Sequence, residues 1–282
     1  MLFRSIAARD NSSAAKAGLR PGDYIRAIND VPTRDMSTWE GARLLRGAAG
    51  TKVRLTVFRN NQADPHEVEL TREVIAAGDV TARTAATGVG YVRVPALGAR
   101  TVDQVKAQIA TLTKAGATKF VLDVRKTTGG TYEQGLALAR LFVAKGTLAQ
   151  RDVKGAPARD TIAANVGDGS ITAPLVLLVD SGTAGGSELF AAALVGNQRA
   201  DLVGAHTIGR AGIQRLIKLP DGSALWLTTA RYLTPSGNAL HERGLEPTVS
   251  VDAPEVEFGQ PAPPGDPALD KALERLAEKK AA

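Results

Sequence analysis

Residues 174–194, PLVLLVDSGTAGGSELFAAAL, join a short apolar run to a glycine-containing turn and then to an alanine-rich stretch. A strand without polar alternation is typical of a parallel sheet whose two faces are both covered by helices. The segment therefore predicts a buried strand, a tight turn and a helix. In many α/β enzymes a nucleophile lies at such a turn, which raises the question of which residue here could attack and which base could activate it.

The order of strand and helix continues on both sides of this segment, from residue 91 onward. YVRVPAL and KFVLDVR are predicted strands, and TVDQVKAQIATLTKAG and TYEQGLALARLFVAKG are predicted helices. Alternation of buried strands with helices indicates βαβ crossovers and a largely parallel sheet. IQRLIKLPDGSALWLTTARYLT adds a hairpin that turns at residues 220–222.

The N-terminal part has a different pattern, with several short strands around one helix at residues 37–46. We expect this small α+β module to span residues 1–72. A connector with room for one strand is expected at 73–90 and the α/β domain at 91–252. Residues 253–282 are predicted to form a Pro-rich segment followed by a charged C-terminal helix.

Composition excludes several classes of site. The chain has no cysteine, and its three histidines lack metal-ligand spacing, so we expect no disulfide, no thiolate catalysis, no metal and no cofactor. The net charge of +6 is spread along the chain and only 4% of residues are aromatic, so no nucleic-acid partner is expected. No apolar run is long enough to cross a membrane, and no signal peptide is visible.

Three segments carry a resemblance to known families. SSAAKAGLRPGDYIRAIND, residues 12–30, resembles the central segment of a PDZ domain. VLDVRKTTGG (121–130) and LTTARYLTPSGNALHERGLEPTVSV (227–251) resemble segments of the carboxyl-terminal processing (tail-specific) serine peptidases. The fold class that this resemblance implies is α+β, with a partial PDZ domain followed by a ClpP/crotonase-like α/β peptidase core that contains a largely parallel sheet.

The resemblance also places the family's Ser–Lys dyad on this chain. Alignment on the shared Ser-Glu pair puts Gly185 at the nucleophile position and, twenty-five residues later, Arg210 at the position of the general-base Lys. Gln214 matches the glutamine that orients this base, and Thr127 stands where the family usually has Asn. Glycine has no side chain with which to attack, and arginine stays protonated, so the dyad is predicted to be degenerate.

Other groups near this turn remain candidates. The family's oxyanion hole maps to the backbone N–H groups of Gly129, Gly130 and Gly186. Ser187, Thr183 and Ser181 are alternative nucleophiles, although we expect Ser187 to be a helix cap and Thr183 to be a turn hydroxyl bonded to the backbone. The remaining candidates are His206, as a neutral base, and Asp123 with Arg125, as a structural ion pair or as residues that shape the site.

The PDZ resemblance implies a peptide groove along the helix at 37–46. Its available side chains are those of Trp39, Ala42, Arg43 and Leu45. PDZ domains hold a peptide C-terminus by strand addition. The carboxylate loop and its strand should precede LFRSIA, so we expect a PDZ domain that is truncated at its N-terminus or is itself degenerate.

The function expected from these residues is that of a PDZ-containing family member that binds polypeptide C-termini, unfolded segments or a partner protein without cleavage. The alternative is an active serine-type endopeptidase that uses a displaced hydroxyl near Gly185, so enzymatic status stays open. A cell-wall or nucleic-acid binding module is a weaker third class, motivated only by the isoelectric point of about 9.6. Resemblance to exported relatives implies the periplasm or cell envelope, and a homo-oligomer is compatible with the sequence.

Overall fold

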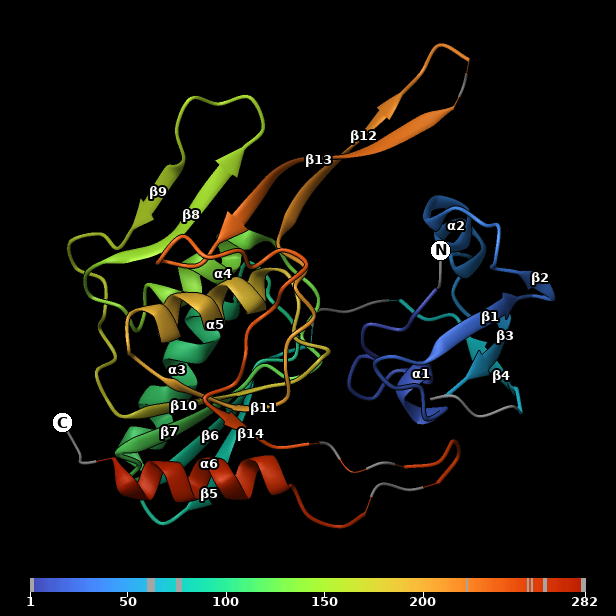
Figure 1. Cartoon of the computed structure of the whole chain (residues 1–282). Coiled ribbons are helices and arrows are strands. Elements are labelled where there is room, and N and C mark those ends of the chain that lie inside the picture. Colours follow the sequence, from blue (N-terminus) through green and yellow to red (C-terminus); the bar gives the residue numbers. More distant parts are fainter. Residues whose placement is uncertain are drawn as a thin grey trace. The chain divides into compact units, whose positions relative to one another are not determined.

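The structure is a computed structural model that forms two compact units (Figure 1). One unit comprises Met1–Gly78 and Pro254–Gly265, and the other comprises Asp79–Ala253 and Asp266–Ala282. The residues that the structure describes are 3–59, 64–74, 78–221, 223–252, 254, 256–260 and 263–279.

The first unit is a small antiparallel sheet with two helices. Its strand order is β2-β1-β3-β4. The elements are α1 (Ser13–Lys16), β1 (Tyr24–Ile28), β2 (Val31–Pro32), α2 (Thr38–Leu45), β3 (Lys52–Phe58) and β4 (His66–Thr71). Val53, Leu55 and Val57 alternate into the core, and the hydroxyl of Ser37 caps α2 by accepting from Glu40 N.

The second unit is built on a six-stranded sheet in the order β14-β11-β10-β7-β6-β5. The neighbouring pairs are parallel except for β5 and β6, which are antiparallel. These strands are β5 (Thr81–Ala86), β6 (Val89–Arg93), β7 (Lys119–Asp123), β10 (Leu175–Val179), β11 (Asp201–Gly204) and β14 (Val249–Ser250). The predicted α+β class with a largely parallel sheet is confirmed.

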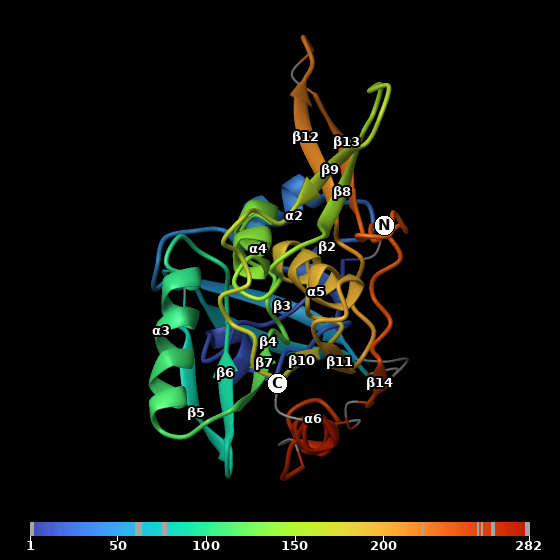
Figure 2. The same ribbon diagram turned by 90° about the vertical axis from the view of Figure 1, so that its left-hand side faces the viewer.

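Both faces of this sheet are covered, which explains the uninterrupted apolar run of β10. Leu175, Leu177 and Val179 enter the larger core on one face, whereas Val176 and Leu178 enter a second core on the other. The larger core packs against α3 (Thr101–Lys114), α4 (Tyr132–Ala139) and α5 (Gly186–Gly196). The second core packs against α6 (Pro267–Glu278), which lies across the opposite face from α5 (Figure 2).

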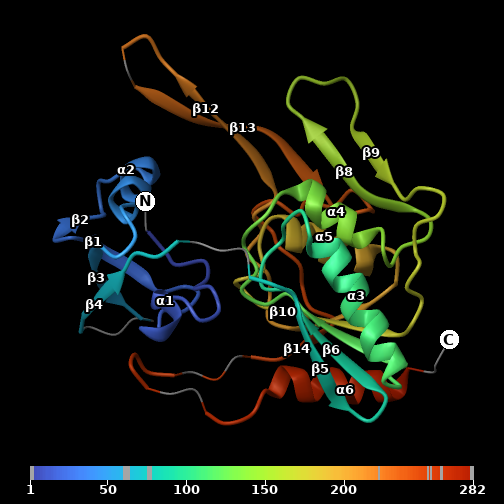
Figure 3. The ribbon, with the colours of Figure 1, turned by 180° about the vertical axis from the view of Figure 1, so that it is seen from behind.

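A separate four-stranded antiparallel sheet, in the order β12-β13-β8-β9, extends from this unit. Its strands are β8 (Thr147–Val153), β9 (Asp160–Ala163), β12 (Gly212–Lys218) and β13 (Ala224–Leu233). The predicted hairpin is confirmed as β12 and β13, although Gly222 of its turn lies outside the described residues. Beyond the β8 pairing, β12 and β13 continue as a two-stranded ribbon (Figure 3).

Several local expectations differ from the structure. The connector expected at 73–90, with room for one strand, contains β5, and β6 begins at Val89, two residues before the strand expected at 91. Before β1, Arg4 forms an isolated bridge with Tyr24, and Ser5 N donates to Asp23 O (2.8 Å). Segment 254–265 groups with the first unit, where Arg59 donates to Val256 O and its guanidinium lies over the Phe258 ring.

Candidate functional site

The turn between β10 and α5 places Gly185 at the start of the helix. Gly185 is the N-cap of α5 and has φ +67° and ψ −123°, a conformation that L side chains rarely adopt. A Cβ built at this position would meet nothing within 4 Å. The predicted nucleophile position therefore lies at a tight turn between strand and helix and has open space beside it.

The candidate oxyanion glycines lie together around Leu97. A Cβ at Gly130 would come within 2.4 Å of Leu97 Cβ, and one at Gly186 within 2.9 Å of Leu97 Cδ1. The backbone N–H groups of Gly129, Gly130 and Gly186 do not donate to another described residue. Unpaired N–H groups at a helix N-terminus attract anions and polarised carbonyls, so this pair of turns can receive a carboxylate or carbonyl oxygen.

The hydroxyls beside Gly185 are buried and bonded to the backbone. Thr183 donates to Val124 O (3.0 Å) and accepts from Asp180 N (3.1 Å). Ser187 donates to Thr127 O and to Ala184 O (2.9 Å). Both side chains are fully buried, whereas Ser181 is exposed.

The predicted cap role for Ser187 is wrong. Gly185 is the N-cap and makes no side-chain capping bond, while Ser187 lies inside the first turn of α5. Its hydroxyl donates to two carbonyls instead of accepting from a helix N–H group. These bonds join α5 to the loop after β7, because Thr127 O also accepts from Ala184 N (3.1 Å).

Arg210 is attached to the same helix turn through Glu188. The Glu188 carboxylate is fully buried and accepts from the Thr207 hydroxyl, from Gly209 N (2.7 Å) and from Arg210 N (2.8 Å). Burial raises the pKa of Glu188, and these three donors act against that rise. Since Glu188 is three residues after Gly185, the two dyad positions are held by one turn of α5.

Tyr132 of α4 supports the same loop from another side. Its hydroxyl donates to Gly212 O (3.0 Å) and Arg210 O (3.2 Å), and its ring lies 4.7 Å from that of Tyr232 between centroids. Burial raises the pKa of Tyr132, and the positive charge of Arg210 lowers it. The Arg210 side chain itself is exposed.

The remaining predicted residues occupy distinct places. Gln214 is exposed on β12 and donates to the Thr228 hydroxyl at 3.5 Å. His206 is 46% exposed and lies 3.5 Å from the Glu246 carboxylate. Asp123 and Arg125 form an ion pair, and Arg125 also binds Asp266, the N-cap of α6.

On α2 of the first unit, the predicted peptide-binding residues are unequally available. Trp39 is 56% exposed and Arg43 is exposed, whereas Ala42 is half-buried and Leu45 packs against the core. A Cβ at Gly41 would come within 2.3 Å of the Phe3 ring. The face of α2 that holds Gly41 is therefore occupied by this ring.

Sequence reasoning missed the roles of Glu188 and Tyr132. Glu188 precedes seven consecutive apolar residues in a helix predicted to be buried, and an acidic side chain there needs hydrogen-bond donors. That signal was present in the sequence. The Tyr132 contact joins α4 to a loop about eighty positions later, and nothing in the local pattern indicates it.

Comparison with known proteins gives matches over both units. A family model described as peptidase family S41 matches residues 88–251, and a PDZ domain model matches residues 5–59. The carboxyl-terminal-processing protease of Synechocystis sp. is 36% identical over 269 residues, covering 94% of this chain and 62% of that protein. Carboxy-terminal processing protease CtpA of Bacillus subtilis is 32% identical over 247 residues, covering 86% and 52%.

A solved structure, the photosystem II D1 C-terminal processing protease, matches with a TM-score of 0.81 and 30% identity. The matched region covers 89% of this chain and 68% of the chain in the solved structure. The chain thus spans between about half and two thirds of the length of the two curated relatives. No helix among the described residues has the length and apolar character needed to cross a bilayer.

Proposed function

This chain belongs to peptidase family S41 and carries a PDZ domain, and from this premise we propose that it binds polypeptide C-termini or a partner protein without cleaving them. The observation that carries the proposal is Gly185. Its backbone forms a sharp turn with open space beside it, but no side chain is present to attack a carbonyl.

The second half of the dyad supports the same conclusion. A general base must be neutral to accept the nucleophile's proton, and a lysine can reach that state when burial lowers its pKa. Arginine stays charged at any relevant pH, and Arg210 is exposed besides. Restoring the nucleophile alone would therefore leave it without a base.

Binding, in contrast, needs only groups that the chain retains. The N–H groups of Gly129, Gly130 and Gly186 make no hydrogen bond to a described residue, and Gly130 and Gly186 both lie beside Leu97. Main-chain donors do not depend on the lost side chains, so a peptide carbonyl or terminal carboxylate can still be held there. Trp39 and Arg43 on α2 offer an exposed aromatic ring and a cation for a second contact in the PDZ domain.

The alternative function is an endopeptidase that uses a displaced hydroxyl. Thr183 and Ser187 are fully buried and bonded to backbone carbonyls, so either one would have to give up those bonds before it could attack. Ser181 is exposed and has no such constraint, which makes it the strongest of the three.

The cellular setting follows from the relatives rather than from the site. They are processing proteases of bacteria and of chloroplasts. We place this chain in the periplasm or cell envelope on that ground, with unfolded segments or C-terminal tails as its partners. A homo-oligomer is compatible with this function.

The test is a binding measurement with cleavage read in the same sample. A labelled peptide with an apolar, free C-terminus is titrated with the protein, and its mass is followed by mass spectrometry. We expect the peptide to bind and to keep its intact mass, and we expect the same peptide with an amidated C-terminus to bind more weakly. Cleavage that Ser181→Ala abolishes would establish the endopeptidase with a displaced hydroxyl. Equal binding of the free and amidated peptides would refute recognition of the C-terminus.

A further inference from the structure

The ribbon formed by β12 and β13 exposes apolar side chains on both of its faces. Leu216, Ile217, Leu225, Trp226 and Leu227 are between 36% and 50% exposed. Cross-strand pairs share a face, and successive residues alternate between faces. The pair Leu216 and Trp226 therefore lies on one face, and the pair Ile217 and Leu225 lies on the other.

An isolated two-stranded ribbon with apolar residues on both faces has no core of its own. Exposed apolar surface of this kind marks an interaction site. The outer edge of β12 is also open, because β12 is the terminal strand of its sheet and no described strand pairs with that edge. An edge of unpaired N–H and C=O groups can accept another extended chain.

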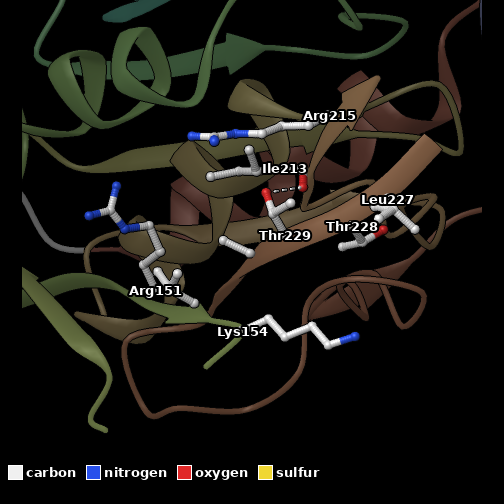
Figure 4. Close-up of a pocket in the computed structure, with 9 residues that line it drawn as sticks. Arg151, Lys154, Ile213, Arg215, Leu227, Thr228 and Thr229 are labelled. Carbon is white, nitrogen blue, oxygen red and sulfur yellow. Dashed lines mark hydrogen bonds between the residues drawn. The ribbon is translucent and has the colours of Figure 1, made fainter. Parts of the chain in front are cut away.

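The charge around this edge is positive. Arg215 and Lys218 lie on β12, and neither forms an ion pair with a described residue. At the root of the ribbon, a pocket of about 550 Å³ is lined by Arg151, Lys154, Ile213, Arg215, Leu227, Thr228 and Thr229, with Val153 and Ala230 completing it (Figure 4). Lys154 also lacks a described acidic partner, while Arg151 is paired with Asp160.

We propose that the β12–β13 ribbon binds an extended polypeptide segment with alternating apolar and acidic side chains, which adds as a strand to the β12 edge. The apolar residues would pack on Leu216 and Trp226 on one face of the ribbon, and the acidic residues, which alternate with them, would face Arg215 on the other. This surface does not include α2 and needs no free C-terminus, and the start of β12 also carries Gln214, the position predicted to orient the base.

A second copy of this chain fits the same edge poorly. Antiparallel pairing of two β12 strands would place the cations Arg215 and Lys218 of one copy near those of the other. Like charges across a strand pair are destabilising. The described part of the ribbon has one acidic residue, Asp221, and its carboxylate accepts from Ser223 at the tip.

The test uses two amidated eight-residue peptides, one alternating Val with Glu and the other alternating Val with Lys. Binding to the whole chain is measured by calorimetry, and hydrogen exchange of residues 212–218 is followed by mass spectrometry. We expect only the glutamate peptide to bind and to slow exchange in β12. Because both peptides are amidated, failure here leaves the proposed capture of C-termini untouched.

Two variants locate the site. Arg215→Glu should weaken binding about tenfold, since the attraction between this side chain and the acidic residues becomes a repulsion. Trp226→Ala should weaken it while leaving the charge unchanged. The matched control, Lys106→Glu on an exposed position of α3, changes net charge equally and should bind within twofold of the unaltered chain.

Equal loss in the α3 control, or equal binding of both peptides, would overturn the proposal in favour of non-specific attraction. Protection of residues 212–218 without peptide, in a sample that sediments as a dimer, would make a second copy the occupant. Ribbon-dependent binding to phosphatidylglycerol vesicles with no binding of the glutamate peptide would make it a lipid surface. Circular dichroism of each variant separates these results from unfolding.

Discussion

The region around the first turn of α5 has a buried side and an open side, and the two sides differ in which polar side chains they carry. On the buried side, Ser187 and Glu188 are fully inaccessible, and their polar groups bind the loops after β7 and before β12. On the open side are Gly185, with vacant space where a side chain would lie, and Arg210, with an exposed cation. The groups that hold the backbone are present, and under our proposal the groups that would perform attack and proton transfer are absent.

The groups that stabilise the turn are therefore different from those that would carry out catalysis. A turn that keeps its hydrogen bonds can present N–H groups to a peptide, but without a hydroxyl and a neutral amine it cannot form an acyl intermediate. Substitutions on the buried side should therefore change stability, and substitutions on the open side should change chemistry.

The largest effect is expected from Glu188→Ala. The change leaves the Thr207 hydroxyl and the N–H groups of Gly209 and Arg210 unpaired in a buried place, so the free energy of unfolding should fall by about 3 kcal/mol. Urea unfolding followed by circular dichroism measures it. Glu274→Ala, on the exposed side of α6, is the matched control and should cost under about 0.5 kcal/mol. Equal losses of stability in Glu188→Ala and Glu274→Ala would show that the buried hydrogen bonds of Glu188 do not support the turn.

Ser187→Ala should lower the free energy of unfolding by about 2 kcal/mol, because Ala184 O and Thr127 O each lose a buried donor. Ser181→Ala, which changes an exposed hydroxyl in the same turn, should be within about 0.5 kcal/mol of the unaltered chain. The same urea titrations compare the two. A neutral Ser187→Ala would mean that its hydroxyl does not support the turn.

Gly185→Ala should cost about 1 kcal/mol. The added methyl group has room, but a φ of +67° strains an L residue. Thermal unfolding measures the loss, and peptide binding should be unchanged because the neighbouring N–H groups stay in place. If Gly185→Ala weakened peptide binding, Gly185 would contribute to binding directly, and this prediction would be contradicted.

The smallest effect concerns pH. Burial raises the pKa of Glu188 above its ordinary value of 4.5, so the folded chain holds this proton more tightly than the unfolded one. Stability from this group is present below pH 4.5 and is lost as the pH rises through the raised pKa. Glu188→Gln should therefore flatten the fall in urea midpoint above pH 4.5. An unchanged pH profile would contradict the assignment.

Local patterns were enough to predict much of this architecture. The apolar run at 175–179, the glycine turn and the capped helix at 38–45 each depend on neighbours in sequence. The resemblance to the family supplied the positions of Gly185 and Arg210. Neither source predicted that α6 covers the second face of the sheet, or that 254–265 returns to the first unit, because both depend on contacts between distant segments.

The site shows the same limit. Asp123 and Arg125 were recognised as a possible ion pair, but the third member, Asp266, lies 141 positions from Arg125. The edge of β12 became visible only from the order of strands in its sheet. Sequence patterns identify candidate groups, and the topology decides which of them meet.

The most direct test of the central claim is mass spectrometry of an unfolded protein with an apolar C-terminus after incubation with four forms of this chain. These are the unaltered chain, Gly185→Ser, Arg210→Lys, and the double variant Gly185→Ser/Arg210→Lys. We predict cleavage by the double variant alone, because the turn has room for a serine and only lysine can lose its proton to serve as base. Cleavage by the unaltered chain would contradict the account.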